Sequence, residues 1–394
     1  MGRTDGRADF SVRQAPSQIY RNAVTQWEQA WINHWKNPAH FRRPTHRTRG
    51  EADSVWLTRE LFGIVARGRI RVGSKTRDLG VLFFKEHRRY REPASVTISR
   101  TPDGRWWLSL TFDDGVKVQK PEAILEELRL LSAEQLEATV VGNDRGVVRQ
   151  MQSSDGRTLA FTEAKKAKIK HWNRRIKKLN RKLARQTNKT SKRRAKTRHK
   201  LARTHARVAD LRRDQAHQVS HVAVQTPARV LAFEDLRLRN MVARPKPVPN
   251  ESGTGHKPNG AAAKAGLNRS IHNAAMGMIL QFVRYKAARV GKLVLTVPAH
   301  HSSQECSQCG HTCRANRPSQ AEFHCQACGH TENADANASR VIKKRGLAAL
   351  QAELWAPGRG ADQLPVEATG RRKCKPALQG ANEAGFFRSA HLAA

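Results

Sequence analysis

The amino-acid sequence predicts a mixed α/β chain, in which a helical segment and a small β-domain precede a larger α/β domain with an inserted metal-binding ribbon. Three observations predict this class. Apolar alternation and turn signals between residues 55 and 112 indicate short strands, whereas 3.6-residue periodicity elsewhere indicates long helices. Two Cys-x-x-Cys pairs lie between residues 306 and 328, with the spacing of a zinc ribbon. The 394 residues are enough for two or three domains.

The net charge restricts the class of partner. The chain has 73 Lys and Arg residues against 33 Asp and Glu residues, a formal charge of +40. Such an excess repels itself unless a polyanion neutralises it, and nucleic acid does so with release of counterions. A solvated basic surface without a partner is the alternative. No apolar run reaches the ~18–20 residues of a membrane helix. The N-terminus lacks the apolar core of a signal peptide, so we expect a cytoplasmic protein.

The N-terminal third is predicted to contain one helix and a set of short strands. A helix is expected over 17–35, capped by Ser17. Its apolar residues fall on one face and are expected to pack in a core: Ile19, Ala23, Trp27, Trp31 and Trp35. Strands are expected within 64–72 and 81–84, and 96–99 should pair with 107–112 across the Pro-Asp-Gly turn at 101–104. Residues 121–137 are predicted to form an acidic helical connector.

The second domain is predicted to open with a β-meander at residue 138. A strand over 138–141 ends in the segment 142–146, which contains Asp144 between two glycines. Further strands are expected over 147–152 and 158–161, separated by a Ser-Asp-Gly turn. RNase H-like folds begin with a meander of this kind.

A strongly basic segment follows the meander. Residues 164–209 contain 20 Lys or Arg residues and no Asp or Glu. Apolar residues recur near heptad spacing, which predicts two long helices in a hairpin with one narrow apolar stripe. The stripe comprises Ile169, Trp172, Ile176, Leu179 and Leu183. The alternative is a disordered basic tract, although such tracts rarely keep an apolar stripe.

The C-terminal half adds two strands and a long helix. A buried strand over 229–233 leads directly into Glu234, and a Pro/Gly/Asn-rich loop over 244–262 follows it. One long amphipathic helix is then expected through Ile271 and Tyr285, ended by Gly291, before a strand over 293–297. From about residue 346 the periodicity is lost, which predicts a disordered tail over 346–394.

Four cysteines predict a structural zinc site. Cys306, Cys309, Cys325 and Cys328 form two Cys-x-x-Cys pairs, and each pair is followed by Gly-His. Four thiolates complete a tetrahedral zinc shell and leave no open position. A redox dithiol pair is the alternative, and His311 and His330 could compete as ligands. Cys313 breaks the spacing, and Cys374 is expected to be a free thiol in the tail.

Three carboxylates lie at positions that suggest phosphodiester chemistry. Asp144 ends the first strand of the second domain, Glu234 directly follows a buried strand, and Asp335 begins a helix after the ribbon. Two-metal hydrolysis needs a few carboxylates that converge on Mg²⁺ ions about 4 Å apart. Each acid by itself also fits a turn, a strand end or a helix cap.

These parts, in this order, resemble the TnpB family of OrfB-type transposases, which are transposon-encoded RNA-guided DNA endonucleases related to type V CRISPR effectors. The matching residues are 142–146 for the first RuvC-like motif, Phe233–Leu236 with Asn240 and Met241 for the second, and Asp335, Asn337, Ala338 and Ile342 for the third. The ribbon also matches, including Ser303 and Gln304 before Cys306.

The resemblance implies a RuvC-like domain over 138–345 with Asp144, Glu234 and Asp335 as catalytic ligands of two Mg²⁺ ions. It also implies a wedge-like β-domain over 55–120, of β-barrel type, a helical recognition remnant over 1–54, and a zinc ribbon over 300–332. Guide RNA would read target DNA by base pairing. The basic hairpin over 163–215 would grip phosphates through Lys170, Arg174, Arg175, Lys177, Lys178, Arg181 and Lys182.

Two departures from the family pattern leave other functions open. Little sequence precedes the helix at 17–35, so the N-terminal recognition region is expected to be shortened. Asn143 occupies a position where the family usually has an apolar residue. A catalytically inactive or decayed nucleic-acid-binding protein is the first alternative to an active nuclease. A conventional strand-transferring transposase is the second, because such enzymes also use RNase H-like carboxylates.

Overall fold

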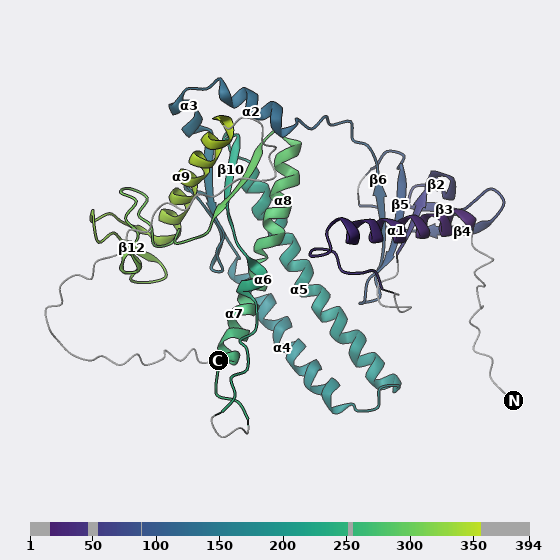
Figure 1. Cartoon of the computed structure of the whole chain (residues 1–394). Helices are drawn as coiled ribbons and strands as arrows, with labels where there is room; N and C mark the ends of the chain where they lie inside the picture. Colours follow the sequence, from purple (N-terminus) through teal and green to yellow (C-terminus); the bar gives the residue numbers. More distant parts are fainter. Residues whose placement is uncertain (1–15, 46–53, 88, 251–254, 356–394) are drawn as a thin grey trace. The chain divides into compact units, whose positions relative to one another are not determined.

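The computed structural model describes residues 16–45, 54–87, 89–250 and 255–355, and Figure 1 labels many of their elements. The chain divides into two compact units. The first contains residues 1–117 and 163–211, and the second contains residues 118–162 and 212–394. Across the described ranges, no helix combines the length and the apolar character that a membrane span requires.

The first unit contains the predicted helix and two three-stranded antiparallel sheets. One sheet has the order β1-β5-β6 and the other the order β2-β3-β4. The elements are α1 (Ser17–Lys36), β1 (Ser54–Thr58), η2 (Arg59–Leu61), β2 (Phe62–Ala66), β3 (Arg69–Gly73), β4 (Asp78–Phe83), β5 (Ser95–Arg100) and β6 (Trp106–Thr111). The predicted hairpin is confirmed, because Val96 pairs with Leu110 and Gly104 closes the turn at φ 81°.

The aromatic face of α1 differs from the prediction. Trp27 and Trp35 are 61% and 68% exposed, and no side chain of α1 that the structure describes is fully buried. The ring of Trp31 instead contacts the rings of Trp27 and Trp35, at 5.9 and 5.4 Å between centroids. Ile19 packs against the core of the β-sheets. The helix begins after Pro16, and no side chain caps it.

The basic segment is helical, as predicted. α4 (Glu163–Arg185) and α5 (Lys192–Val224) are joined by a short connection, and Ile169 on the apolar stripe is buried. The guanidinium of Arg207 in α5 lies 4.3 Å from the ring centroid of Trp172 in α4. This cation–π contact and the stripe hold the two helices together within the first unit.

The second unit is built on a five-stranded sheet with the order β11-β10-β7-β8-β9. The strands are β7 (Val140–Asp144), β8 (Arg149–Ser153), β9 (Thr158–Ala160), β10 (Val230–Asp235) and β11 (Leu293–Pro298). β10 runs parallel to both β7 and β11, whereas β8 is antiparallel to both β7 and β9. The sheet therefore starts as a meander and continues with parallel strands.

Helices cover both faces of this sheet (Figure 1). Ile342, Leu350 and Leu354 of the long C-terminal helix pack with α2 and α3 on one face, and α8 packs with the end of α5 on the other. The remaining elements are α2 (Pro121–Arg129), α3 (Ala133–Ala138), α6 (Leu238–Met241), α7 (Ala261–Ala274), α8 (Met276–Arg289), η3 (Arg314–Asn316), β12 (Glu322–His324), β13 (Thr331–Asn333) and α9 (Ala334–Trp355).

Two helical predictions in the second unit need correction. The long helix expected through Ile271 and Tyr285 is divided into α7 and α8 at Ala275, whose φ is 54°. α9 extends to Trp355, so residues 346–355 are helical rather than part of a tail, because Leu350 and Leu354 bury their side chains against the sheet. Residues 356–394 lie outside the described part of the chain.

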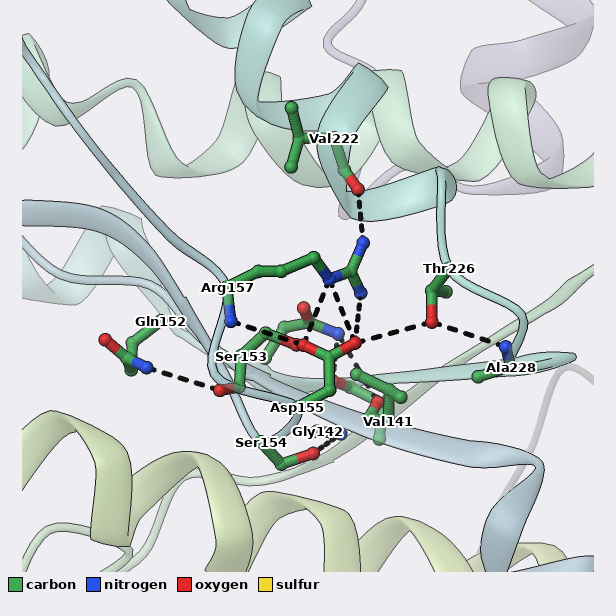
Figure 2. A network of polar contacts seen from close by, with 12 residues as sticks. Val141, Gly142, Gln152, Ser153, Ser154, Asp155, Arg157, Val222, Thr226 and Ala228 are labelled. Atoms are coloured by element: carbon green, nitrogen blue, oxygen red, sulfur yellow. Dashed lines mark hydrogen bonds and ion pairs between the residues drawn. The ribbon is translucent and has the colours of Figure 1, made fainter.

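A polar network anchors the turn between β8 and β9 (Figure 2). Arg157 pairs with Asp155 at 2.6 Å and donates a hydrogen bond to the Val222 carbonyl at the end of α5. Thr226 donates to the same carboxylate, at 3.4 Å. Burial raises the pKa of Asp155, but its hydrogen bonds outweigh that effect and hold the pKa below the usual value. The network therefore ties the meander to the end of α5.

Candidate active site

Asp144 and Glu234 occupy neighbouring positions at one edge of the sheet. β7 and β10 pair in parallel, and the last paired residues are Asn143 and Phe233. Asp144 is the residue after Asn143, and Glu234 is the residue after Phe233. Because adjacent strands lie about 4.8 Å apart, the backbones of the two acids are neighbours. Since side chains alternate between faces, both acids share a face with Val230, which packs in the core beneath α9.

Asp335 lies in the first turn of α9, on the same face of the sheet. The Asn333 side chain accepts hydrogen bonds from the backbone N–H groups of Asp335 and Ala336, at 3.2 and 3.4 Å, so it caps the helix. α9 crosses the sheet closely, because a Cβ added at Gly142 would lie 2.1 Å from the Ser339 carbonyl oxygen. A glycine at 142 therefore permits the approach that brings Asp335 to the strand ends.

The three carboxylates interact electrostatically. Burial, followed by the negative charges of Glu234 and Asp335, raises the pKa of Asp144 to about 7. Burial also raises the pKa of Glu234. Like charges held together in a buried place destabilise the ionised forms, and a divalent cation relieves this repulsion. Carboxylate oxygens are also the donors that Mg²⁺ prefers, so the types of residue present suit such ions.

Arginine side chains at this site were not predicted from the sequence. Arg317, in the ribbon, places Nη2 3.8 Å from Asp335 Oδ1, and Arg149 of β8 places Nε 4.0 Å from Asp335 Oδ2. The charge of Arg317 also opposes the rise in the pKa of Asp144 that burial causes. No sequence signal could single these two out among 73 Lys and Arg residues.

Two buried side chains hold the Glu234 segment. Arg145 donates hydrogen bonds to the Glu234 carbonyl at 2.5 Å and to the Met276 carbonyl at 2.8 Å. Burial lowers the pKa of Arg145 to about 10, which leaves it charged at neutral pH. The hydroxyl of Ser302 donates to Glu234 Oε1. The carboxylate and its backbone therefore both have fixed partners.

The four predicted cysteines form one cluster, with their sulfur atoms within 4.8 Å of one another. The Sγ atoms of Cys306 and Cys328 are 3.7 Å apart, and those of Cys309 and Cys325 are 3.6 Å apart. Zinc–sulfur bonds of about 2.3 Å in a tetrahedron require sulfur atoms ~3.8 Å apart, so the cluster fits zinc. The cluster includes neither histidines nor Cys313. Cys374 lies outside the described residues.

Backbone turns and one buried asparagine build the ribbon around this cluster. Gly310 and Gly329 follow the two cysteine pairs with φ angles of 74° and 73°, which favour glycine. Asn316 is fully buried, and its amide donates to the carbonyls of Gln304 and His311. Its carbonyl oxygen accepts from the Gln326 N–H at 2.9 Å. Asn316 thus joins the two halves of the ribbon.

The predicted phosphate-binding residues lie on α4 in the first unit, and all of their side chains are exposed. They are Lys170, Arg174, Arg175, Lys177, Lys178, Arg181 and Lys182. The apolar stripe of α4 faces inward, which leaves the cationic side chains free to meet a polyanion. Nucleic-acid binding by these residues stays a prediction.

Comparisons with known proteins place the chain in a family. Residues 116–244 match the model of OrfB_IS605, described as a probable transposase, and residues 277–342 match that of the Cas12f1-like TNB domain. "Putative RNA-guided DNA endonuclease InsQ" of Escherichia coli (strain K12) is 30% identical over 359 residues, which cover 90% of this chain and 81% of InsQ. A "Putative RNA-guided DNA endonuclease" of Streptomyces pristinaespiralis is 27% identical over 84% of this chain and 71% of the relative.

A solved complex of Cas12f1 with guide RNA and target DNA aligns with 79% of this chain and 74% of its own, at 14% identity and a TM-score of 0.35. The match to InsQ extends over nearly the whole chain and most of that relative. Within this span lie the strand ends, the ribbon and the start of α9. The chain therefore belongs to the TnpB family of OrfB-type transposases.

Proposed function

We propose that the chain is an RNA-guided, metal-dependent DNA endonuclease of a transposable element, which cleaves phosphodiesters at a single RuvC-like site. The observation that carries the proposal is geometric: Asp144 and Glu234 directly follow paired residues of adjacent parallel strands, and Asp335 begins the helix that packs across these strands. InsQ and the Streptomyces relative both carry the name "Putative RNA-guided DNA endonuclease", which supports the same activity.

The topology of the second unit supports an RNase H-like assignment for residues 138–345. A meander of β9, β8 and β7 is followed by the parallel strands β10 and β11. Asp144 and Glu234 leave neighbouring parallel strands at the same edge, which is where a sheet of this type can gather ligands. Asp335 then enters from the helix that packs across these strands.

The chemistry follows from the residues that surround the acids. Bound divalent cations would activate a water molecule and stabilise the leaving oxygen of a phosphodiester. Ser302 holds one oxygen of Glu234 through its hydroxyl. Arg145 fixes the backbone of Glu234 by donating to its carbonyl. Arg317 lies beside Asp335, where its charge can attract a phosphate of the substrate strand.

The partners follow from the charge and the family. A net charge of +40 favours a polyanionic partner of large area, as a guide RNA paired with DNA would be. The exposed cations of α4 provide a surface that binds phosphates without reading sequence. Sequence would be read by base pairing between guide and target.

Cleavage of a guide-matched plasmid tests the proposal. The full chain is expressed with the RNA from its own locus, and supercoiled plasmid is incubated with Mg²⁺. We expect linear product from the wild type and a loss of at least about 10³-fold in rate for Asp144→Ala. Asp155→Asn, a surface-turn acid outside the cluster, is the matched control and should cut. Equal cleavage by wild type and Asp144→Ala would refute the assigned site.

A further inference from the structure

The loop that leads from β11 into the ribbon contacts Glu234 directly. Ser302 lies between the end of β11 and the zinc-site residue Cys306, and its hydroxyl donates to Glu234 Oε1. Ser302 and Glu234 are 5% and 6% exposed, so the hydrogen bond is shielded from water. A buried carboxylate oxygen with a fixed donor has a restricted orientation.

A second connection joins the ribbon to α9. Asn337 is fully buried, and its Oδ1 accepts from the Ser307 N–H at 2.9 Å. Its Nδ2 donates to the Glu305 carbonyl at 2.7 Å. Glu305 and Ser307 flank Cys306, so the amide of Asn337 grips the backbone on both sides of a zinc-site cysteine. Asp335 lies two residues before Asn337 in the same helix.

A third contact joins the same loop to the middle of α9, through Arg345. Arg345 donates to the carbonyls of Pro298 and His300, at 2.6 and 2.8 Å, and pairs with the Glu305 carboxylate at 2.5 Å. The segment 298–307 is therefore attached to α9 from its start to its end. Because this segment includes Cys306, its path depends on the fold of the ribbon.

We propose that Ser302 and Asn337 are positioning residues, through which the zinc ribbon sets the placement of Glu234 and Asp335. This inference rests on the proposed function, because it concerns the same carboxylate site. Ser302 acts on Glu234 through its hydroxyl, and Asn337 acts on Asp335 by fixing the start of α9 to the ribbon. The ribbon thus contributes to the affinity of the carboxylates for divalent cations without touching them.

Binding of Mn²⁺, measured without cleavage, tests the inference. The full chain, freed of nucleic acid at high salt, is titrated with Mn²⁺, and free Mn²⁺ is followed by electron paramagnetic resonance. Binding that Asp144→Asn abolishes defines the carboxylate site. We expect Ser302→Ala and Asn337→Ala to weaken this binding about 10-fold, the usual effect of losing a group that orients a metal ligand. Ser339→Ala, which removes only a bond to the Ala336 carbonyl within α9, should leave it unchanged.

Zinc content and thermal stability are measured on the same samples. Weaker Mn²⁺ binding by Ser302→Ala, with one zinc per chain and an unchanged melting temperature, supports positioning rather than general support of the fold. Wild-type Mn²⁺ affinity in both variants, with zinc retained, overturns the inference and leaves the proposed nuclease intact. If the wild type binds no Mn²⁺ that depends on Asp144, the proposed function fails, and the inference fails with it.

Discussion

We predict that Asp144→Asn stabilises the protein in the absence of divalent cations, because it removes a buried carboxylate that Glu234 and Asp335 repel. In the folded chain, burial and the charges of Glu234 and Asp335 raise the pKa of Asp144 from 3.8 to about 7. At about 1.4 kcal/mol per pKa unit, ionising this carboxyl above pH 7 costs the fold up to about 4 kcal/mol. Because the charges of Asp144 and Glu234 interact, their titrations depend on each other, and the expected gain for asparagine is nearer ~2 kcal/mol.

The stability difference between Asp144→Asn and the wild type should depend on pH, with a sign that follows from the raised pKa of Asp144. Below about pH 4 the carboxyl is protonated in both the folded and the unfolded chain, so the substitution should change little. Between about pH 4 and 7 the unfolded chain ionises while the folded chain keeps its proton, and the wild type loses stability as the pH rises. The advantage of Asp144→Asn should therefore grow through this window and stay constant above it.

Scanning calorimetry at pH 5 and pH 8 measures this difference in Mg²⁺-free buffer. Chelators are omitted so that zinc remains bound. We expect the melting temperature of Asp144→Asn to exceed that of the wild type by roughly 4–8 °C at pH 8. Asp155→Asn should have the opposite sign, because the ion pair with Arg157 lowers the pKa of Asp155 (Figure 2). A destabilised Asp144→Asn variant at pH 8, with zinc retained, would refute the reasoning.

Three further predictions concern packing, zinc and charge. Gly142→Ala should destabilise by about 3 kcal/mol in urea, because its Cβ would collide with the α9 backbone, whereas Gly266→Ala, with open space around it, should not. Cys306→Ser should lower the zinc content, the solubility and the cleavage rate together, and full stability without zinc would contradict this. Replacing Arg174 and Lys178 with glutamine should reduce the log–log salt slope of DNA binding by about 2 in fluorescence anisotropy, whereas Lys178→Arg should leave it unchanged.

Local sequence signals predicted most of the second unit and the basic hairpin of the first. The strand before Glu234 was recognisable because its apolar run is short and continuous, and the cysteine spacing indicated the ribbon directly. The basic hairpin was recognisable because apolar residues such as Ile169 and Trp172 keep a regular spacing within a cationic segment. These features depend on residues close together in the chain, where periodicity and spacing carry the information.

Features that depend on distant contacts were mispredicted or missed. Trp27 and Trp35 have the spacing of a core face, yet nothing that the structure describes covers them, and periodicity cannot reveal that. Helicity beyond residue 346 depends on the packing of Leu350 against the sheet. The interruption at residue 275 places an alanine, rather than the nearby Gly277, at positive φ, which no sequence rule predicts. Arg317 and Arg149 gain their place beside Asp335 only when the ribbon and β8 fold onto the same edge.

The amino-acid sequence alone supplied the groups on which the proposed chemistry depends: four thiols, three acids at element ends, and an excess of positive charge that favours a polyanionic partner. That Asp144 and Glu234 end neighbouring strands beneath the helix that Asp335 begins emerges only in the folded chain, because long segments separate these residues and no local pattern encodes how the segments pack. The structure also decided that Ser302 and Asn337 join the ribbon to this site. Buried hydrogen bonds between remote residues exist only once the chain has folded.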